Sequence, residues 1–252
     1  MAENSRQLPN CAKTIGKINP VEARRKADMT TKPKALIFDI DDTLVDTTPS
    51  YRGSIIETAR HFGGIVTMAH IAAAKAKGDA NNDWVLTRDL LLSQGIDVPL
   101  DAVTEVFESL YQGTDDTPGL KYRETLLLER DVILALAATY KMGVVTGRPR
   151  KDAMDFILQH QLTDVFQVVV TMDDGPLKPD PFPVKKAVES LGADTWMIGD
   201  TPDDIRSAVG AGITAVGVIA PADDPEEAKK AMTAAGAKMV LDKTVDLKGI
   251  LL

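Results

Sequence analysis

Four short segments of the chain carry polar side chains whose types and spacing could do chemistry. The first is Phe38-Asp39-Ile40-Asp41-Asp42-Thr43-Leu44, in which carboxylates two residues apart follow an apolar run. Side chains at positions i and i+2 of an extended strand point to the same side. Like charges held that close need a cation or a proton between them. An Asx turn that ends a strand uses the same residue types, so this segment alone leaves both interpretations open.

The second and third segments could bind an anion. In Thr146-Gly147-Arg148-Pro149-Arg150, a hydroxyl and backbone N–H groups stand between an apolar run and a helical pattern, where anions bind readily. Thr146 could equally serve only as the cap of that helix. In Lys178-Pro179-Asp180-Pro181, two prolines restrict the backbone around Lys178, although an isolated lysine is usually a solvated surface charge.

The fourth segment is acidic. Ile198-Gly199-Asp200-Thr201-Pro202-Asp203-Asp204 places three carboxylates around one turn. Acidic residues at a helix N-terminus can simply complement the helix dipole. Oxygen-only ligands are also what a hard divalent cation such as Mg2+ requires, so the segment is a candidate metal site.

The elements that must position these segments are short apolar strands alternating with helices. Such alternation predicts an α/β fold, a doubly wound (Rossmann-like) parallel sheet with helices on both faces. Function in such a sheet collects at the carboxyl ends of the strands, where the strand order reverses. The predicted strands are 35–40, 142–145, 168–170, 196–198 and 215–219, and the predicted helices are about 124–140, 150–160, 181–191, 202–210 and 225–236.

A helical stretch interrupts this alternation after the first strand. Apolar residues recur at helical spacing in segments 51–62, 66–77, 84–94 and 100–112, and the run from Gly113 to Gly119 reads as a linker. The predicted organisation is therefore a flexible basic leader (1–34), a Rossmann-like core (35–47 and 120–252) and an inserted α-helical domain (48–119).

Composition and charge exclude several classes of protein. The 252 residues are 44% hydrophobic and carry a net charge of −8, which argues against disorder and against a general nucleic-acid binder. A single cysteine, Cys11, excludes an intramolecular disulfide, and no apolar run is long enough to span a bilayer. We therefore expect a soluble cytoplasmic protein without membrane or nucleic-acid partners. Residues 1–34 carry eight basic and three acidic side chains, so an organelle transit peptide is the alternative to a flexible leader.

Taken together and in this order, the four segments resemble the four motifs of the haloacid dehalogenase superfamily of hydrolases. The resemblance covers roughly residues 33–47 and 120–250. The helical insert between the first two motifs is similar to the small cap of subfamily I, in its phosphoglycolate-phosphatase-like branch. One departure is Asp42, which stands where many members have Gly. Because Asp tolerates a left-handed backbone better than most residues, we expect the turn to form.

This resemblance implies a reaction and a set of site residues. Asp39 would attack phosphorus and form an aspartyl-phosphate, and Asp41 would act as the general acid and then the general base. Mg2+ would be the cofactor. Its expected ligands are the Asp39 carboxylate, the Asp41 backbone carbonyl, Asp200 and, through water, Asp204; the expected phosphate-binding groups are Thr146, the N–H of Gly147, and Lys178.

Related chemistries remain as alternatives. True haloacid dehalogenases lack an acid at the position of Asp41, so the resemblance favours a phosphatase that hydrolyses a small phosphorylated metabolite. A phosphomutase of the same family uses the same motifs, and a catalytically silent protein that binds such a metabolite is the non-enzyme alternative. A phosphonate-hydrolysing branch uses a cap lysine. We expect Lys75 and Lys77 of the insert to be ordinary surface lysines instead.

A narrower resemblance concerns segments 146–153 and 199–204, which are similar to a subgroup with some members named as a histidine-biosynthesis dehydratase. Such dehydratases bind manganese through many histidines. This chain has three histidines, His61, His70 and His160. Its composition therefore does not favour dehydratase chemistry.

Substrate specificity would come from the insert, and the sequence indicates a few candidate residues. The polar run from Gly78 to Trp84 ends in an aromatic side chain, so Asn82 and Trp84 could contact the leaving group. Alternatively, Trp84 anchors the next helix inside the insert. Tyr51 and Arg52 are further candidates for lining the cleft.

Overall fold

The computed structural model describes residues 32–78 and 80–252. Residues 1–31 of the predicted basic leader lie outside the described residues. Residues 33–252 form one unit, which contains all of the predicted core and the predicted insert.

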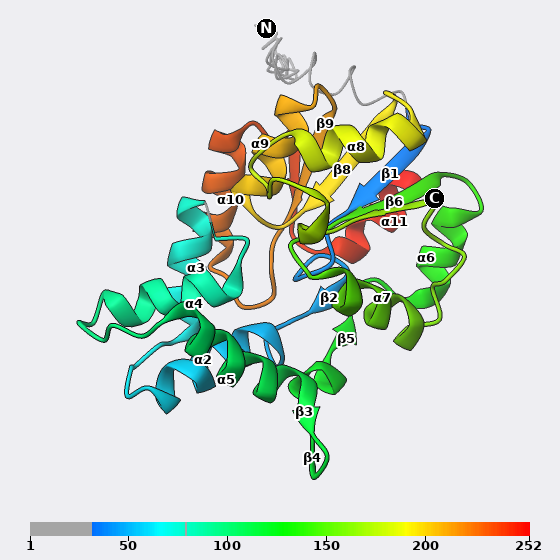
Figure 1. Cartoon of the computed structure of the whole chain (residues 1–252). Helices are drawn as coiled ribbons and strands as arrows, with labels where there is room; N and C mark the ends of the chain where they lie inside the picture. The colour runs from blue at the N-terminus through cyan, green and yellow to red at the C-terminus, as the bar shows by residue number, and fades with distance from the viewer. Residues whose placement is uncertain (1–31, 79) are drawn as a thin grey trace, which may run out of the picture. The chain divides into compact units, whose positions relative to one another are not determined.

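The centre of the fold is a parallel sheet of six strands in the order β10-β9-β8-β1-β6-β7. The chain runs from β1 outward to β7, then returns past β1 to β8 and continues to the opposite edge (Figure 1). The predicted doubly wound α/β fold is therefore confirmed, and the strand order reverses beside β1. The strands are β1 (Ala35–Phe38), β6 (Lys141–Val145), β7 (Val168–Val170), β8 (Thr195–Gly199), β9 (Thr214–Val218) and β10 (Met239–Leu241).

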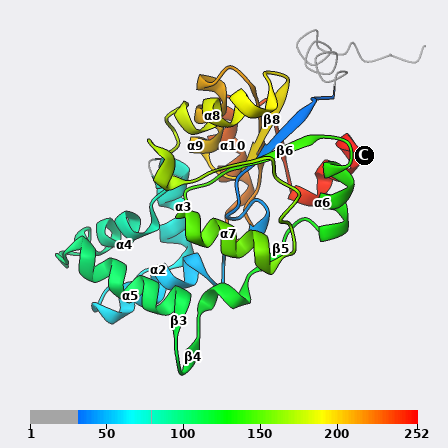
Figure 2. The same cartoon turned by 45° about the vertical axis from the view of Figure 1, so that its right-hand side comes forward.

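Helices cover both faces of this sheet, because successive residues of a strand point to opposite sides. Leu36 and Phe38 of β1 belong to a buried cluster with α6 (Arg130–Ala137), α7 (Arg150–Gln159) and α11 (Leu247–Leu251). Ala35 and Ile37 belong to a second cluster with α8 (Phe182–Leu191), α9 (Pro202–Gly210) and α10 (Pro225–Ala235). The two groups of helices lie on opposite sides of the sheet (Figure 2).

The insert has a hydrophobic core of its own. Its helices are α2 (Tyr51–His61), α3 (Met68–Lys77), α4 (Asp83–Leu92) and α5 (Leu100–Gln112), close to the four predicted segments. Ile55, Leu91 and Phe107 are among the fully buried side chains of this core. The insert can therefore hold its own shape while the sheet holds the motifs.

Two short strands pair where the chain enters and leaves the insert. β2 (Val45–Asp46) and β5 (Thr125–Leu126) form an antiparallel ribbon, so the two crossings run side by side. The 3-10 helix η1 (Leu120–Arg123) packs against α2 and α5 on the insert side. The structure thus puts the second crossing at 125–126, beyond the predicted boundary at residue 120, and α6 begins at Arg130 rather than near residue 124.

The predicted linker at 113–119 is instead a hairpin of β3 (Gly113–Thr114) and β4 (Thr117–Pro118). Gly113 has φ 87°, and a Cβ there would lie 2.3 Å from the backbone nitrogen of Gly119. Glycine thus permits a close approach of the two strands, which composition alone suggested only as a linker.

Smaller differences occur at the ends of elements. β1 stops at Phe38 instead of residue 40, because the carbonyl of Ile40 accepts turn hydrogen bonds from Thr43, Leu44 and Val45. The edge strand β10 and helix α11 were not predicted. Two further 3-10 helices are η2 (Met172–Asp174) and η3 (Thr244–Asp246). Among the described residues, no helix is both long and apolar enough to cross a membrane.

Candidate active site

All four motifs meet at the carboxyl ends of β1, β6 and β8. Phe38 pairs with Val144 and with Ile198, so the three strands end at the same level. Asp39 follows β1 and Asp200 follows β8. The parallel register therefore brings together Asp39 and Asp200, which lie 161 positions apart in the sequence.

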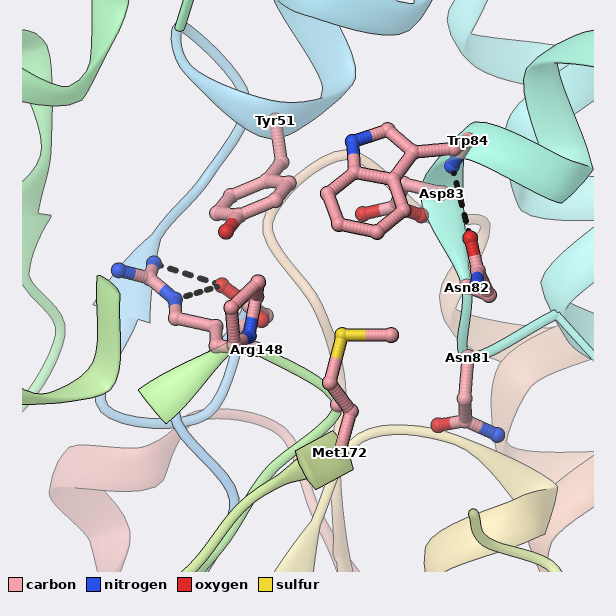
Figure 3. A pocket seen from close by; sticks show the side chains of 10 residues that line it. Tyr51, Asn81, Asn82, Asp83, Trp84, Arg148 and Met172 are labelled. Atoms are coloured by element: carbon pink, nitrogen blue, oxygen red, sulfur yellow. Dashed lines mark hydrogen bonds and ion pairs between the residues drawn. The ribbon is translucent and has the colours of Figure 1, made fainter. Parts of the chain in front are cut away.

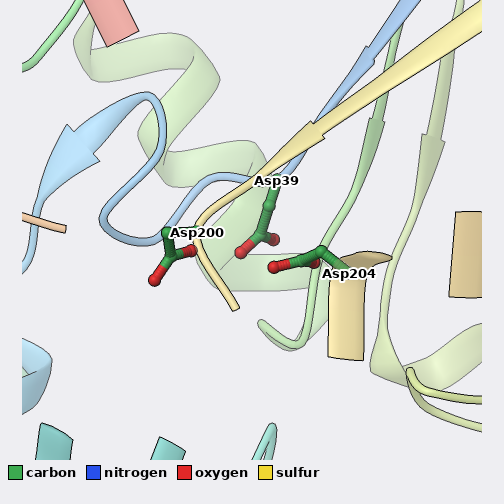
Figure 4. A group of neighbouring side chains, drawn as sticks. All are labelled: Asp39, Asp200 and Asp204. Atoms are coloured by element: carbon green, nitrogen blue, oxygen red, sulfur yellow. The ribbon is translucent and has the colours of Figure 1, made fainter. Parts of the chain in front are cut away.

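Three buried carboxylates form the centre of the site. One oxygen from each of Asp39, Asp200 and Asp204 lies within 4.8 Å of the other two (Figure 4). Burial raises the pKa of Asp39 to about 7, against the opposing charge of Lys178. Burial, followed by the charge of Asp204, raises the pKa of Asp200 well above its ordinary value. Both shifts mean that burial disfavours the charged form of these two carboxyls in the absence of a further cation.

A hard divalent cation fits this cluster. The donors are oxygens, as Mg2+ prefers. Oδ1 of Asp39 has no hydrogen-bond partner among the described residues apart from its ion pair with Lys178. Asp200 is held by a hydrogen bond of 3.2 Å from the hydroxyl of Thr43. A bound cation would lower the pKa of both carboxyls.

Lys178 is buried inside the site rather than solvated. Its side chain is 1% exposed, and its Nζ lies 2.9 Å from Oδ1 of Asp39 and 2.6 Å from Oδ1 of Asp204. The same ammonium donates to the carbonyl of Val145 at 3.2 Å. Burial alone would lower the pKa of Lys178, but the two carboxylates raise it above its ordinary value. The ammonium is therefore a fixed positive charge beside Asp39.

Of the three carboxylates in the cluster, Asp204 accepts the most hydrogen bonds from the described residues. Its Oδ2 accepts from the backbone N–H and the hydroxyl of Thr201 at 3.0 and 2.6 Å, in a capping box that begins α9. Its Oδ1 pairs with Lys178. These contacts leave Asp204 better placed to hold Lys178 or a water than to bind a cation directly.

The carboxylate of Asp41 contacts Arg148. Its Oδ1 accepts from Nε and Nη2 of Arg148 at 2.9 and 2.6 Å (dashed lines at Arg148 in Figure 3). Arg148 belongs to the second motif, but the sequence did not predict a role for it. Its contact with Asp41 joins residues 107 positions apart, and no local pattern in the sequence signals such a contact.

The predicted phosphate-binding segment lies under the insert. The hydroxyl of Thr146 accepts from the backbone N–H of Arg148 at 3.2 Å. A Cβ on Gly147 would lie 2.6 Å from the carbonyl oxygen of Asn81. Glycine is thus required here for the close approach of the insert to the motif.

A loop of the insert contacts the core directly. Nδ2 of Asn81 donates to the carbonyl of Lys178 at 2.9 Å and to Oδ2 of Asp203 at 2.7 Å. Asn81 was not among the predicted site residues. Its neighbour Asn82, which was, caps α4 by accepting from the backbone N–H groups of Trp84 and Val85.

A small pocket lies between this loop and the first two motifs. The side chains of Tyr51, Trp84 and Met172 point toward it (Figure 3). The indole N–H of Trp84 also donates to Glu108 of α5 at 3.1 Å. Trp84 therefore lines the pocket and is anchored in the insert at the same time. The pocket is lined by Asp41, Tyr51, Asn81, Asn82, Asp83, Trp84, Gly147, Arg148, Pro149 and Met172.

Arg52 is buried, forms two ion pairs within the protein, and does not line this pocket. Its Nε donates to Oδ2 of Asp42 at 2.6 Å and its Nη1 to Asp223 at 2.7 Å. Asp42 has φ 53°, so the left-handed turn expected at this departure from glycine does form. Burial opposes the charge of Asp42, but Arg52 outweighs it and lowers the pKa.

The expectation that Lys75 is a surface lysine is wrong. Its side chain is 11% exposed, and its Nζ lies 3.6 Å from Oδ1 of Asp83. Lys77 is exposed, as expected. The helical pattern did not predict the difference, because burial of Lys75 depends on how α3 packs within the folded unit.

Comparison with known proteins adds an independent line of support. A profile of the haloacid dehalogenase-like hydrolases matches residues 36–218. An imidazoleglycerol-phosphate dehydratase from Phytophthora nicotianae is 43% identical over 202 residues, which cover 77% of this chain and 45% of that protein. The chain thus spans less than half the length of this relative. A phosphoglycolate phosphatase from Vibrio vulnificus is 26% identical over 193 residues, covering 73% of this chain and 83% of that protein.

Solved structures share the fold. A predicted phosphoglycolate phosphatase from Haemophilus somnus matches with a TM-score of 0.67 and 18% identity, over 88% of this chain and 100% of that one. CbbY from Rhodobacter sphaeroides, solved in complex with phosphate, matches with a TM-score of 0.65 and 21% identity, over 87% and 97%. At these identities the likeness concerns the fold alone.

Proposed function

The chain belongs to the haloacid dehalogenase-like hydrolase family, and on this premise we propose that it is a Mg2+-dependent phosphatase of a small phosphate monoester. The observation that carries the proposal is the buried contact of Lys178 with Asp39, beside Asp200 and at the end of β1. A phosphate dianion that enters this acidic cluster needs such fixed positive charge. The names of relatives such as the Vibrio phosphatase favour a small substrate.

Asp39 is the nucleophile in this proposal. One of its carboxylate oxygens forms a bond to phosphorus while the bond from phosphorus to the ester oxygen breaks, which gives an aspartyl-phosphate. Support comes from the position of Asp39 at the point where the strand order reverses. Its ion pair with Lys178 fixes the carboxylate before the substrate arrives.

Asp41 moves the protons. It donates one to the departing ester oxygen and then accepts one from the water that attacks the aspartyl-phosphate. Inorganic phosphate leaves, and Asp39 returns to its carboxylate. Asp41 lines the pocket, and its side chain is 16% exposed, so it can reach a bound leaving group.

Mg2+ would supply charge neutralisation for the phosphoryl group when bound. We assign its protein ligands as the carboxylates of Asp39 and Asp200 and the backbone carbonyl of Asp41, with Asp204 acting through water. The phosphoryl oxygens would contact Thr146, the N–H of Gly147 and Lys178. Lys178 provides the full positive charge in this set.

We further propose that the insert is a cap over a core formed by 35–47 and the C-terminal part of the chain. The contacts of Asn81 with Lys178 and Asp203 support this role, because they join the insert to two of the motifs. A closed cap would exclude water and select the leaving group. Trp84 and Asn82 are the specificity candidates within it.

The alternatives differ in the fate of the phosphoryl group. A phosphomutase would pass it from the aspartyl-phosphate to a sugar instead of water, and a silent binding protein would not form the intermediate. The dehydratase name of the Phytophthora relative concerns a protein of which this chain spans 45%.

A cytoplasmic location, with an organelle as the alternative, stays a prediction.

A phosphate-release screen over a library of phosphorylated metabolites tests this proposal. With Mg2+, we expect release from one small class of monoesters, with Asp39→Asn protein as the blank. A reaction that only converts one phosphorylated sugar to its isomer would instead identify a phosphomutase. Tight binding without release or isomerisation would identify a silent protein.

A further inference from the structure

The guanidinium of Arg148 is enclosed by protein on its edges. Its Nε and Nη2 donate to Asp41, Nη2 also donates to Oε1 of Glu124 at 3.0 Å, and Nη1 donates to the hydroxyl of Tyr111 at 3.2 Å. The side chain is 1% exposed. Four of its five N–H donors are committed to protein groups, so Arg148 is better placed to hold Asp41 than to bind the phosphate of a substrate.

Two aromatic rings also lie close to the same guanidinium group. The Cζ atom lies 4.9 Å from the ring centre of Tyr51 and 5.6 Å from that of Phe156. Carboxylates and rings at these distances hold a guanidinium in one orientation. Burial alone would lower the pKa of Arg148, but Asp41 and Glu124 raise it well above its ordinary value. Arg148 is therefore a rigid, permanently charged group whose effect must pass through its neighbours.

We propose that Arg148 is a positioning residue for Asp41. Nε and Nη2 of Arg148 both donate to the same oxygen of Asp41, Oδ1. Among the residues that the structure describes, the second oxygen, Oδ2, accepts no hydrogen bond. Arg148 thus fixes the carboxylate through one oxygen and leaves the other for proton transfer. This inference rests on the proposed function, in which Asp41 is the general acid and base.

Glu124 ties this arrangement to the crossings between core and insert. Its Oε1 accepts from Arg148, from the hydroxyl of Ser50 at 2.8 Å and from that of Tyr111 at 3.4 Å. Ser50 directly precedes α2 on the first crossing, and Glu124 directly precedes β5 on the second. A movement of the insert at these crossings would therefore shift Glu124 and, through their hydrogen bond, the side chain of Arg148. The position of Asp41 is coupled in this way to that of the insert.

The leaving group of the substrate separates positioning of Asp41 from a general structural role. A poor leaving group needs a proton from Asp41 as the ester bond breaks, whereas an activated one such as 4-nitrophenolate does not. The value of kcat/KM reports steps up to formation of the aspartyl-phosphate, so later hydrolysis does not affect it. Loss of correct positioning should thus harm phenyl phosphate far more than 4-nitrophenyl phosphate, two substrates of similar size.

The experiment measures kcat/KM on both substrates, with Mg2+, for the full chain and for Arg148→Met and Arg148→Lys. We expect Arg148→Met to lose about 10-fold more on phenyl phosphate than on 4-nitrophenyl phosphate, which is only a part of the ~10²–10⁴-fold contribution of general acid catalysis because Asp41 itself is still present. Arg148→Lys keeps the charge but cannot hold one oxygen with two parallel N–H groups. It should show the same pattern more weakly, and it carries the test if the methionine variant does not fold.

Asp41→Asn provides the second half of the test. If Arg148 acts through Asp41, adding Arg148→Met to Asp41→Asn should cost less than about 2-fold more on phenyl phosphate, because coupled residues are not additive. Arg150→Met is the matched control. Arg150 is two residues away, is exposed and pairs with Asp174, so it should show no dependence on the leaving group.

Two kinds of failure are distinguishable. If the unaltered chain releases phosphate from neither substrate or any library member, the proposed function fails. The positioning role is wrong, and the proposed function stands, if the unaltered chain is active but the Arg148 variants lower kcat/KM equally on both substrates or on neither. The same conclusion follows if Arg148→Met lowers kcat/KM further in Asp41→Asn protein.

Discussion

Lys178 and Asp39 form a buried ion pair in which the ammonium nitrogen lies 2.9 Å from Oδ1 of the carboxylate. The two residues come from different motifs, 139 positions apart by their numbers. The lysine also pairs with Asp204, so one cation compensates two acids. This arrangement leads to predictions for stability, metal binding and turnover.

The first prediction concerns removal of the lysine charge. Lys178→Met leaves Asp39 and Asp204 without their cation, and breaking a buried pair from one side costs about 3–5 kcal/mol of unfolding free energy. We expect kcat/KM to fall by about 10²–10³-fold, as when a fixed stabilising group is removed from a transition state. Thermal unfolding and phosphate release measure the two effects.

The matched control for that variant is Lys186→Met. Lys186 pairs with Asp174 near the surface, and its side chain is 41% exposed. It should change neither the melting temperature nor turnover appreciably, as is usual for exposed pairs. Equal effects of the two substitutions would contradict the role given to Lys178.

The second prediction concerns pH and Mg2+. In the folded chain without metal, burial raises the pKa of Asp39 from its ordinary value of 3.8 to about 7, against the opposing charge of Lys178. The folded state thus binds this proton more tightly than the unfolded chain, so the contribution of Asp39 to stability falls as pH rises through this window. Mg2+ requires the carboxylate and must displace the proton below pH 7.

We therefore expect the apparent Mg2+ affinity to weaken as pH falls from 8 to 6, by up to about tenfold per pH unit below the pKa of Asp39. Thermal shift titrations with Mg2+ at both pH values measure this. Asp39→Asn protein, which has no proton to displace at that position, should show a smaller dependence on pH. An affinity that is constant with pH, or strengthens in acid, would be inconsistent with Asp39 as a ligand.

The third prediction separates the two roles of Trp84. Trp84→Phe keeps an aromatic face in the pocket but loses the hydrogen bond to Glu108, so it should lower the melting temperature slightly and keep specificity. Trp84→Ala should lose about 1–3 kcal/mol in kcat/KM for the physiological substrate, with a smaller loss for 4-nitrophenyl phosphate. Equal losses on both substrates, together with unfolding at lower temperature, would mean that Trp84 is only an anchor.

The motifs were predictable from sequence for a physical reason. In a parallel sheet the carboxyl ends of neighbouring strands finish on the same side, so Asp39, Thr146 and Asp200 had to lie near one another once their strands were identified. The left-handed turn at Asp42 was likewise expected from its residue type. These features depend on local pattern and on one rule of topology.

Other features depend on tertiary contacts that a local pattern does not contain. The two carboxylate partners of Arg148 lie 107 and 24 positions away, and the sequence around an arginine before a proline does not indicate such partners. Lys75 was expected at the surface, but its exposure follows from packing around α3. The hairpin at 113–118 was missed because its Gly, Asp and Pro residues are equally typical of a linker.

The most direct measurement is to trap the phosphorylated protein. Asp41→Asn protein should react with 4-nitrophenyl phosphate, whose leaving group needs no proton, and should then accumulate the intermediate because its base is missing. After acid quenching, mass spectrometry of the peptides should find one phosphoryl group on Asp39, and none when Asp39→Asn is added. A phosphoryl group on another residue, or near-native turnover by correctly folded Asp39→Asn protein, would contradict the covalent mechanism.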